Sequence, residues 1–179
     1  QQLNTIDKTG TNNGLLIDNV GGNRQIRNVS FESCTGTALS IARSSNGGIW
    51  NTFIEKCFFS GNWQDISIGT IGGFIVIQDC VFASGGTGGG TAIGINGASS
   101  RDIKILNNSF SYTLSGRSLV SISNSEYITF RGNFMPSTVV GTPIMTLGTS
   151  NRCIISNNMI GVNNSGSGAE SNVLRIGAG

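Results

Sequence analysis

The sequence predicts an all-β fold, a single-stranded right-handed parallel β-helix (a solenoid) of about six to seven coils. Three observations predict it: a short phrase recurs along the chain, apolar and polar residues alternate with a period of two, and Gly (27 residues) is frequent while Pro (2 residues) is rare. A repeat of about 20 to 50 residues is typical of solenoids, in which each unit buries its apolar residues by stacking on the next. The period of two, with many β-branched and aromatic residues, favours strands over helices.

The recurring phrase is an apolar residue followed three positions later by Cys or Asn. It occurs at residues 31–34, 54–57, 77–80, 105–108, 130–133 and 155–158, so that neighbouring instances lie 23 to 28 residues apart. We expect its Cys and Asn residues to form one buried stack, because residues that interchange at one repeat position occupy one environment. The thiols then act as small apolar groups, and the amides bond one another from coil to coil. The six positions are Cys34, Cys57, Cys80, Asn108, Asn133 and Asn158.

Each coil divides into three short strands, joined by one bend of constant length and two variable loops. The first strand points inward the apolar pairs Leu15/Ile17, Leu39/Ile41, Ile66/Ile68, Ile93/Ile95, Val120/Ile122, Met145/Leu147 and Leu174/Ile176. The second strand carries the pairs Val29/Phe31, Thr52/Ile54, Ile75/Ile77, Ile103/Ile105, Ile128/Phe130 and Cys153/Ile155. The third strand points one residue inward, and this residue is Gly36 in the first coil, then Phe59, Phe82, Phe110, Met135 and Ile160.

The composition limits the classes of function. Charged residues make up 11% of the chain, the net charge is +2 and histidine is absent. So small a charge argues against nucleic acid as a partner, and without histidine the chain lacks the commonest metal ligand and the usual catalytic base. We therefore expect no metal and no cofactor. No apolar run approaches the about 20 residues that span a membrane, so no membrane partner is expected.

The four cysteines are expected to be free thiols rather than two disulfides. Cys34, Cys57 and Cys80 share one repeat position with asparagine, and Cys153 lies at an apolar strand position. Since the shared position is a buried stack, its thiols pack as small apolar groups.

We expect a single β-helix domain over residues 1–179. The N-terminal residues lack the basic and apolar regions of a signal peptide, so either the chain is not exported by that route or it is a fragment or processed form. The sequence stops shortly after the pair Leu174/Ile176, with no amphipathic cap. Because open coil ends expose strand edges, we expect the chain to be a fragment of a longer protein.

The outward positions differ between the strands. On the first strand they are small and polar, which suits either solvent or a glycan: Ser40, Ser67, Gly94, Ser121, Thr146 and Arg175. On the other two strands they form an apolar stripe: Phe58, Val81, Phe134 and Met159, with Phe53, Val76 and Ile154. A monomer rarely leaves such a stripe in water. Either loops or another subunit should cover it, and a symmetric homo-oligomer would bury it.

Glu32 and Glu55 are the candidate catalytic residues. They are expected at the same outward position of adjacent coils, with their Cα atoms about 4.8 Å apart. Two carboxylates are what glycoside hydrolysis requires, and like charges at that distance raise one pKa, as an acid–base pair needs. Gln78 continues the row and could hold a sugar hydroxyl. The alternative is a solvated pair eased by Lys56, Arg24 or Arg27.

Aromatic residues offer candidate sugar platforms, because their rings stack on the apolar faces of sugars. Trp63, followed by Gln64 and Asp65, is the most attractive, and Trp50 enters the second strand. The alternative is that each Trp covers an edge of the core.

The motif Ile-x-Ile-x-x-Asn-x-Phe at residues 103–110 resembles the coils of the pectate-lyase-like right-handed β-helix superfamily. That superfamily includes polysaccharide lyases, pectin-active hydrolases and the trimeric tailspikes of bacteriophages, and the resemblance covers residues 15–176. It implies a tailspike-like segment in the virion tail that binds a bacterial cell-surface glycan as a homotrimer, and leaves degradation of that glycan open. If the chain is an enzyme, hydrolysis is favoured over a lyase reaction, because no acidic cluster could hold calcium. The alternatives are a non-enzymatic structural or adhesive shaft, and a secreted pectin-type lyase or hydrolase.

Overall fold

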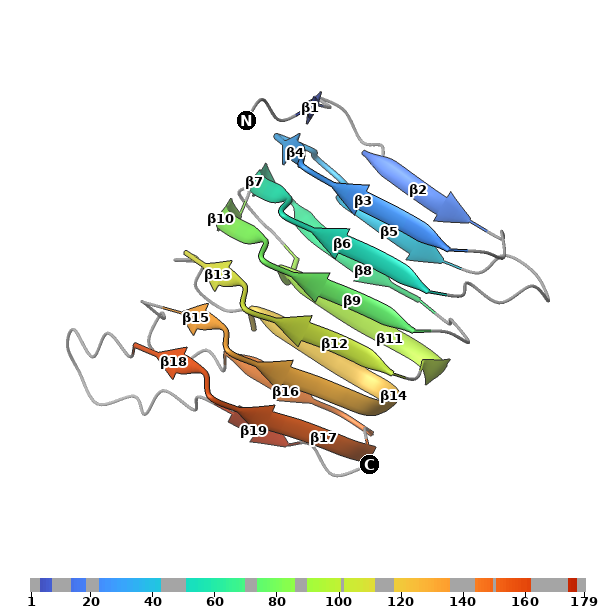
Figure 1. Ribbon diagram of the computed structural model, residues 1–179, viewed down its shortest axis with the longest axis vertical. Helices are drawn as coiled ribbons and strands as arrows, with labels where there is room; N and C mark the ends of the chain where they lie inside the picture. Colours follow the sequence, from blue (N-terminus) through green and yellow to red (C-terminus); the bar gives the residue numbers. More distant parts are fainter. Residues whose placement is uncertain are drawn as a thin grey trace.

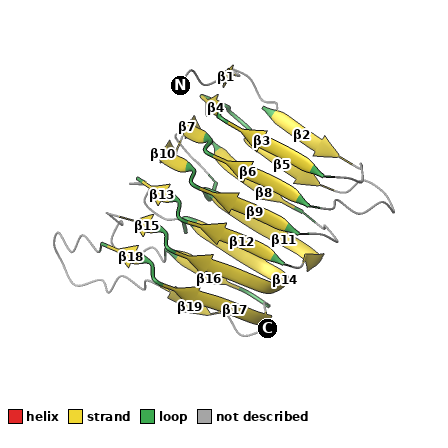
Figure 2. Cartoon of the chain, in the orientation of Figure 1, coloured by secondary structure: helices red, strands yellow, loops and turns green. Residues whose placement is uncertain are grey.

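The computed structural model describes residues 4–7, 14–18, 23–42, 51–69, 74–85, 90–100, 102–111, 118–135, 144–149, 151–161 and 174–176. These residues form strands β1 to β19 and no helix, and every strand pairing is parallel (Figure 1 and Figure 2). Strand β1 lies at one end of the stack and β17 and β19 at the other (Figure 1). The predicted all-β parallel solenoid is confirmed.

The strands belong to three faces, which we name sheets A, B and C. Sheet A consists of β1 (Asn4–Asp7), β4 (Val29–Glu32), β7 (Phe58–Asn62), β10 (Val81–Gly85), β13 (Ser109–Phe110), β15 (Phe134–Met135) and β18 (Met159–Ile160). Sheet B consists of β2 (Leu15–Asp18), β5 (Thr37–Ala42), β8 (Gln64–Ile68), β11 (Ile93–Ser100), β14 (Val120–Arg131), β16 (Met145–Leu147) and β19 (Leu174–Ile176). Sheet C consists of β3 (Arg24–Arg27), β6 (Thr52–Glu55), β9 (Ile75–Gln78), β12 (Ile103–Leu106), β14 and β17 (Asn151–Ser156). The twelve-residue β14 runs through both B and C.

Sheet B confirms the predicted first-strand pairs. Leu15 pairs with Leu39, Leu39 with Ile66, and the register continues unbroken to Met145 and Leu174. The inward side chains from Leu39 to Leu147 are buried. Each coil therefore covers the apolar face of its neighbour.

A phenylalanine stack fills the core behind sheet A. Phe31, Phe59, Phe82 and Phe110 are fully buried. The rings of Phe31 and Phe59 are nearly parallel, with centroids 4.9 Å apart, and the next two spacings are 5.0 Å and 4.7 Å. This spacing is the separation of neighbouring strands, so the stack follows directly from the coil repeat.

The bend between sheets C and A has one backbone conformation in every coil. Its second residue has a φ between 53° and 68°, in the left-handed region that Asn and Gly adopt most readily. The residues are Asn28, Lys56, Asp79, Asn107, Gly132 and Asn157. This repeated turn explains why the bend keeps its length while the other connections vary.

An asparagine ladder follows this bend on the inside. The side-chain oxygen of Asn133 accepts from the backbone N–H of Asn108 at 2.9 Å and from its amide at 3.1 Å. Asn133 in turn donates to the carbonyl of Ile105 at 3.0 Å and to Asn158 at 3.0 Å. Asn108 closes the ladder by accepting from the N–H of Cys80 at 2.9 Å. The predicted stack of Cys57, Cys80 and the three asparagines is confirmed.

Cys34 is not a member of this stack, so the predicted alignment of the first coil is wrong. Ser30 pairs with Phe58 and Phe31 with Phe59, which gives Val29 the place that Cys57 holds in the next coil. Phe31 is therefore the inward residue of sheet A, a role the sequence assigned to Gly36. Cys34 lies one bend later, where its N–H donates to the side-chain oxygen of Asn62 at 2.9 Å.

The first coil is misaligned because of the composition of β3. Its residues Arg24 and Ile26 occupy the inward row of sheet C, paired with Thr52 and Ile54. Arginine at an inward position hides the alternation that marks the strand elsewhere. The phrase 31–34 resembles the others by composition, so the sequence alone predicts the same bend there.

All four cysteines are free thiols, as predicted. Over the ranges given above, the chain forms no helix with the length and apolarity to cross a membrane.

Candidate functional site

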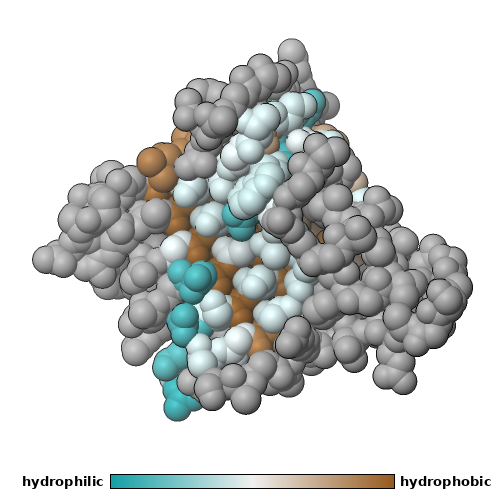
Figure 3. Space-filling model, turned by 180° about the vertical axis from the view of Figure 1, so that it is seen from behind, coloured by the Kyte–Doolittle hydropathy of each residue, from teal (hydrophilic) through white to brown (hydrophobic). Residues whose placement is uncertain are grey.

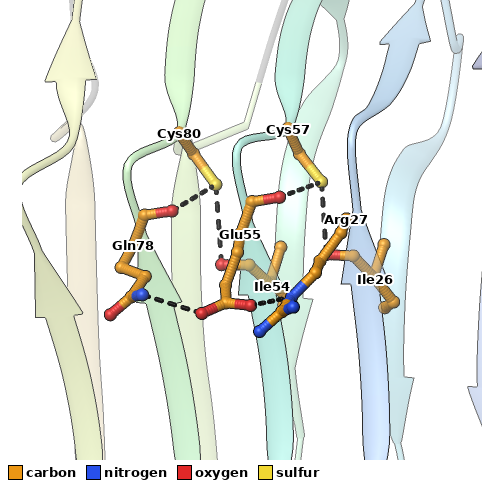
Figure 4. A network of polar contacts seen from close by, with 7 residues as sticks. All are labelled: Ile26, Arg27, Ile54, Glu55, Cys57, Gln78 and Cys80. Atoms are coloured by element: carbon orange, nitrogen blue, oxygen red, sulfur yellow. Dashed lines mark hydrogen bonds and ion pairs between the residues drawn. The ribbon is translucent and has the colours of Figure 1, made fainter. Parts of the chain in front are cut away.

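Two polar regions stand out, and the first is a charged bend made by Arg27, Glu55 and Gln78. These residues lie side by side in β3, β6 and β9. The amide of Gln78 donates to Oε1 of Glu55 at 2.7 Å, and Nε of Arg27 forms an ion pair with Oε2 (Figure 4). Glu55 is buried, at 8% exposure. Both carboxylate oxygens are thus engaged within the protein, and the three side chains tie three coils together.

Two buried thiols lie beneath this bend. Cys57 donates to the carbonyl of Glu55 at 3.4 Å, and Cys80 to the carbonyl of Gln78 at 3.3 Å (Figure 4). The neighbouring Cys57 thiol, together with burial, raises the pKa of Cys80 well above its usual value of 9.0. Since the thiolate is the reactive form, Cys80 is inert and its role is packing.

The side chains at the charged bend also line a surface pocket of about 280 Å³. Its lining residues are Arg27, Asn28, Glu55, Lys56, Gln78 and Asp79. Lys56 and Asp79 are neighbours in successive coils and carry opposite charges. Among the described side chains, the ion pair found is that of Arg27 and Glu55, and Lys56 and Asp79 are not joined.

The predicted pairing of Glu32 with Glu55 is wrong. Glu32 lies in β4 of sheet A, where it pairs with Ser60 and accepts a hydrogen bond from the hydroxyl of Ser30. Glu55 lies in sheet C, next to Arg27 and Gln78. The error has the same origin as that of Cys34, because both residues belong to the shifted phrase. Gln78 does continue the row of Glu55, as predicted.

The second polar region is the outer face of sheet B. Its middle column consists of Ser40, Ser67, Gly94, Ser121 and Thr146, all in register and half-buried. The flanking columns are Thr37, Gln64, Thr91 and Ser118 on one side, and Gly69, Asn96, Ser123 and Gly148 on the other. From β5 to β16 these columns contain no charged residue. The described surface in Figure 3 is accordingly mostly pale, between hydrophilic and hydrophobic.

Trp63 and Gln64 lie at the start of β8, beside this face. Trp63 is 40% exposed. A Cβ added at Gly90 of the next coil would stand 3.3 Å from the Trp63 ring, and one at Gly94 would stand 2.5 Å from the Gln64 amide nitrogen. Glycine at both positions therefore leaves the space into which these two side chains fit.

Of the other three predicted sugar-binding residues, Gln78 lies at the charged bend and bonds to Glu55. Asp65 is fully buried and accepts from the amide of Asn62 at 2.9 Å, so it faces the interior and not a ligand beside Trp63. Trp50 lies outside the described residues. The sequence pattern could not separate Asp65 from Gln64, because sheet B has two consecutive inward residues at this point.

The apolar stripe is only partly exposed. Val81, Phe134, Ile154 and Met159 are exposed by 39% to 66%. Phe53 and Phe58 are half-buried, and Val76 is 5% exposed and so offers little surface to a partner. Beside Val76, the rings of Phe74 and Phe53 pack edge-on, with their centroids 6.0 Å apart. The Lys104 ammonium lies 4.7 Å from the centroid of the Phe74 ring.

The chain matches no known protein-family model, no curated protein and no solved structure.

Proposed function

We propose that this β-solenoid binds a bacterial surface polysaccharide, as the tailspike-like proteins that its coils resemble do. The observation that carries the proposal is the exposed Trp63 ring, seated over Gly90 at the edge of the hydroxyl-rich face of sheet B. An aromatic ring offers a sugar a flat apolar surface, and the hydroxyl and amide groups beside it supply donors and acceptors. Together they provide the two kinds of contact that a saccharide needs.

Binding is better supported than cleavage. Hydrolysis by two carboxylates requires one that is free to act as acid, base or nucleophile. Glu55 accepts from Gln78 and pairs with Arg27, and Glu32 lies in another sheet. Asp79 is the other carboxylate in the pocket of Glu55, and no described contact links the two. Degradation of the glycan is therefore a secondary hypothesis, tested by looking for new reducing ends after incubation with capsule or O-antigen.

The test is a screen of the purified chain on immobilised bacterial polysaccharides, repeated with Trp63→Ala. We expect a specific hit whose affinity falls about tenfold, since an aromatic contact contributes up to about 1.5 kcal/mol. Trp63→Phe keeps a ring and should restore most of the binding.

Tyr127→Ala is the matched control, because Tyr127 is equally exposed, at 42%, and lies in the sheet C part of β14. Binding that survives Trp63→Ala but is lost in Tyr127→Ala would overturn the proposed site. A chain that binds no glycan in the screen would be better described as a structural or adhesive shaft.

We also propose that the solenoid self-associates as a homotrimer through its exposed apolar residues. Exposed side chains of this size are costly in water, and Phe134 and Met159 are adjacent in sheet A. Light scattering at micromolar concentration should give three times the monomer mass, and Met159→Asp should reduce it. A monomer mass for the unaltered chain contradicts the trimer.

A further inference from the structure

We infer that the glycan bound by this protein is uncharged and runs along the solenoid axis over the middle column of sheet B. This inference rests on the proposed function and names the class of ligand and its direction. It is carried by the free hydroxyl groups of Ser40, Ser67 and Ser121, by the lack of charged residues at the described outward positions from β5 to β16, and by the Gln64 amide, which lies where a side chain at Gly94 would stand. Beyond β16 the column continues to Arg175 in β19.

The hydroxyl groups of the middle column differ from those of the neighbouring columns in their hydrogen bonding. In the columns on either side of the middle one, side chains bond to their neighbours in the next coil: Thr37 to Gln64 at 3.4 Å, and Ser123 to Asn96 at 3.0 Å. Ser40, Ser67 and Ser121 make no side-chain hydrogen bond to any described residue. Thr146, at the far end of the column, bonds to the hydroxyl of Ser118 at 2.5 Å. The three serines of the column therefore keep their donors and acceptors free for a ligand.

The column also sets the direction in which a bound polymer would run. Neighbouring strands lie about 4.8 Å apart, so the four steps from Ser40 to Thr146 cover about 19 Å along the axis. The free hydroxyls lie one above another in this column, whereas along each strand the next outward residues are already paired or are glycine. A polymer contacts successive free hydroxyls only if it follows the column.

Gly94 interrupts the column of hydroxyl groups. The Gln64 amide nitrogen lies 2.5 Å from the place where a Gly94 Cβ would stand. Its two hydrogen bonds, to Thr91 and to the carbonyl of Ile66, are long at 3.3 Å and 3.4 Å. Gln64 thus presents a weakly held donor at the coil that lacks a hydroxyl, and it links the column to Trp63.

The charge of the face decides whether it suits a neutral or an acidic sugar. Acidic sugars are recognised by Arg and Lys, whose charge-assisted bonds to carboxylates are the strong ones. No described outward position of sheet B between β5 and β16 carries either residue. Burying a carboxylate against hydroxyls alone leaves it without a counter-charge, which is costly. The face is therefore complementary to a neutral polyhydroxylated chain.

The experiment compares neutral and uronate-containing bacterial oligosaccharides of equal length on one array, in 50 mM and 500 mM salt. We expect neutral hits whose affinity is the same at both salt concentrations, because no ion pair is there to be screened. Hits confined to acidic glycans, weakening in high salt, would overturn this inference. The proposed function would survive that outcome provided that Trp63→Ala still lost binding.

Three variants of sheet B test the place of binding. Ser67→Asp and Ser121→Asp put a charge on the column and should each weaken the neutral hit by tenfold or more. Ser156→Asp is the matched control, because Ser156 is a half-buried outward serine of sheet C, next to Arg131. Ser67→Ala removes a hydroxyl without adding charge and should weaken binding about threefold.

Neutral binding that all three sheet B variants leave unchanged contradicts the inference. A lack of any glycan binding by the unaltered chain contradicts the proposed function itself.

Discussion

The charged bend and the outer face of sheet B are built on the same coil repeat, yet they use their polar groups in opposite ways. At the bend, Glu55 is bonded on both oxygens by side chains from the two neighbouring coils. On the face, Ser40, Ser67 and Ser121 bond to no described side chain. Polar groups that satisfy one another hold a structure together, whereas groups left free at a surface are available to a ligand.

The bend therefore contributes to stability, whereas the face is where we propose that a ligand binds. The charged side chains Arg27 and Glu55 of the bend are bonded to each other, and Gln78 is bonded to Glu55. A search for carboxylates alone would therefore choose the bend and not the proposed binding face.

Asn133→Ala should destabilise the fold most, by about 2–5 kcal/mol, because it leaves the buried N–H of Asn108 and the carbonyl of Ile105 without partners. Urea unfolding measures the loss. Asn96→Ala is the matched change on the face, where Asn96 is exposed, and should stay within about 0.5 kcal/mol. Equal losses in the two variants would show that the distinction between the inside of the bend and the face is wrong.

Glu55→Gln should cost about 1 kcal/mol of folding free energy, because Arg27 loses its counter-charge while remaining half exposed. The cost should shrink in high salt. Glycan binding, measured on the same hit, should be unchanged. A folded Glu55→Gln protein that no longer binds would move the binding site to the bend and break the comparison.

The stability of the protein should fall as the pH rises above 9, in part through Cys80. The Cys57 thiol and burial raise the pKa of Cys80 above its usual value of 9.0, so the folded state holds the proton more tightly than the unfolded one. That contribution is complete below pH 9 and is lost as the pH rises towards the folded pKa. The same contact lowers the pKa of Cys57, which offsets part of this loss. The test is therefore the double variant Cys57→Ala/Cys80→Ala, whose drop in stability between pH 8 and pH 10 should be smaller than that of the unaltered chain. Identical drops would contradict this role of Cys80.

Lys56→Asn should stabilise the fold by about 0.5–1 kcal/mol. Lys56 has a φ of 53°, a conformation that asparagine adopts at lower cost. Thermal unfolding measures the gain, with Ser67→Ala on the face as a control whose stability should not change by more than about 0.5 kcal/mol. A destabilised Lys56→Asn protein would indicate that the lysine makes a contact worth more than the strain it causes.

Much of the fold could be predicted from residue patterns, because a solenoid repeats them locally. The inward pairs of sheet B alternate strictly, so Leu39/Ile41 and Ile93/Ile95 could be placed in register without coordinates. The asparagine ladder was predictable for the same reason, since Asn108 and Asn133 fall at one repeat position.

The candidate site was predictable only in part. The chemistry of Trp63 and Gln64 marks them as candidates, and in the structure they lie together at the edge of sheet B. Asp65 follows them in the sequence but turns inward, because sheet B departs from strict alternation there. No sequence signal distinguishes the inward direction of Asp65 from the outward direction of Gln64.

By itself the sequence determined the stacked strands, the free thiols and the small uncharged residues of sheet B, because each follows from a repeat read along one chain. The tertiary structure decided which coil Glu32 and Cys34 belong to and that both oxygens of Glu55 are occupied. Those facts depend on which residue of the neighbouring coil lies opposite, and connections of variable length leave that register open until the coils are stacked.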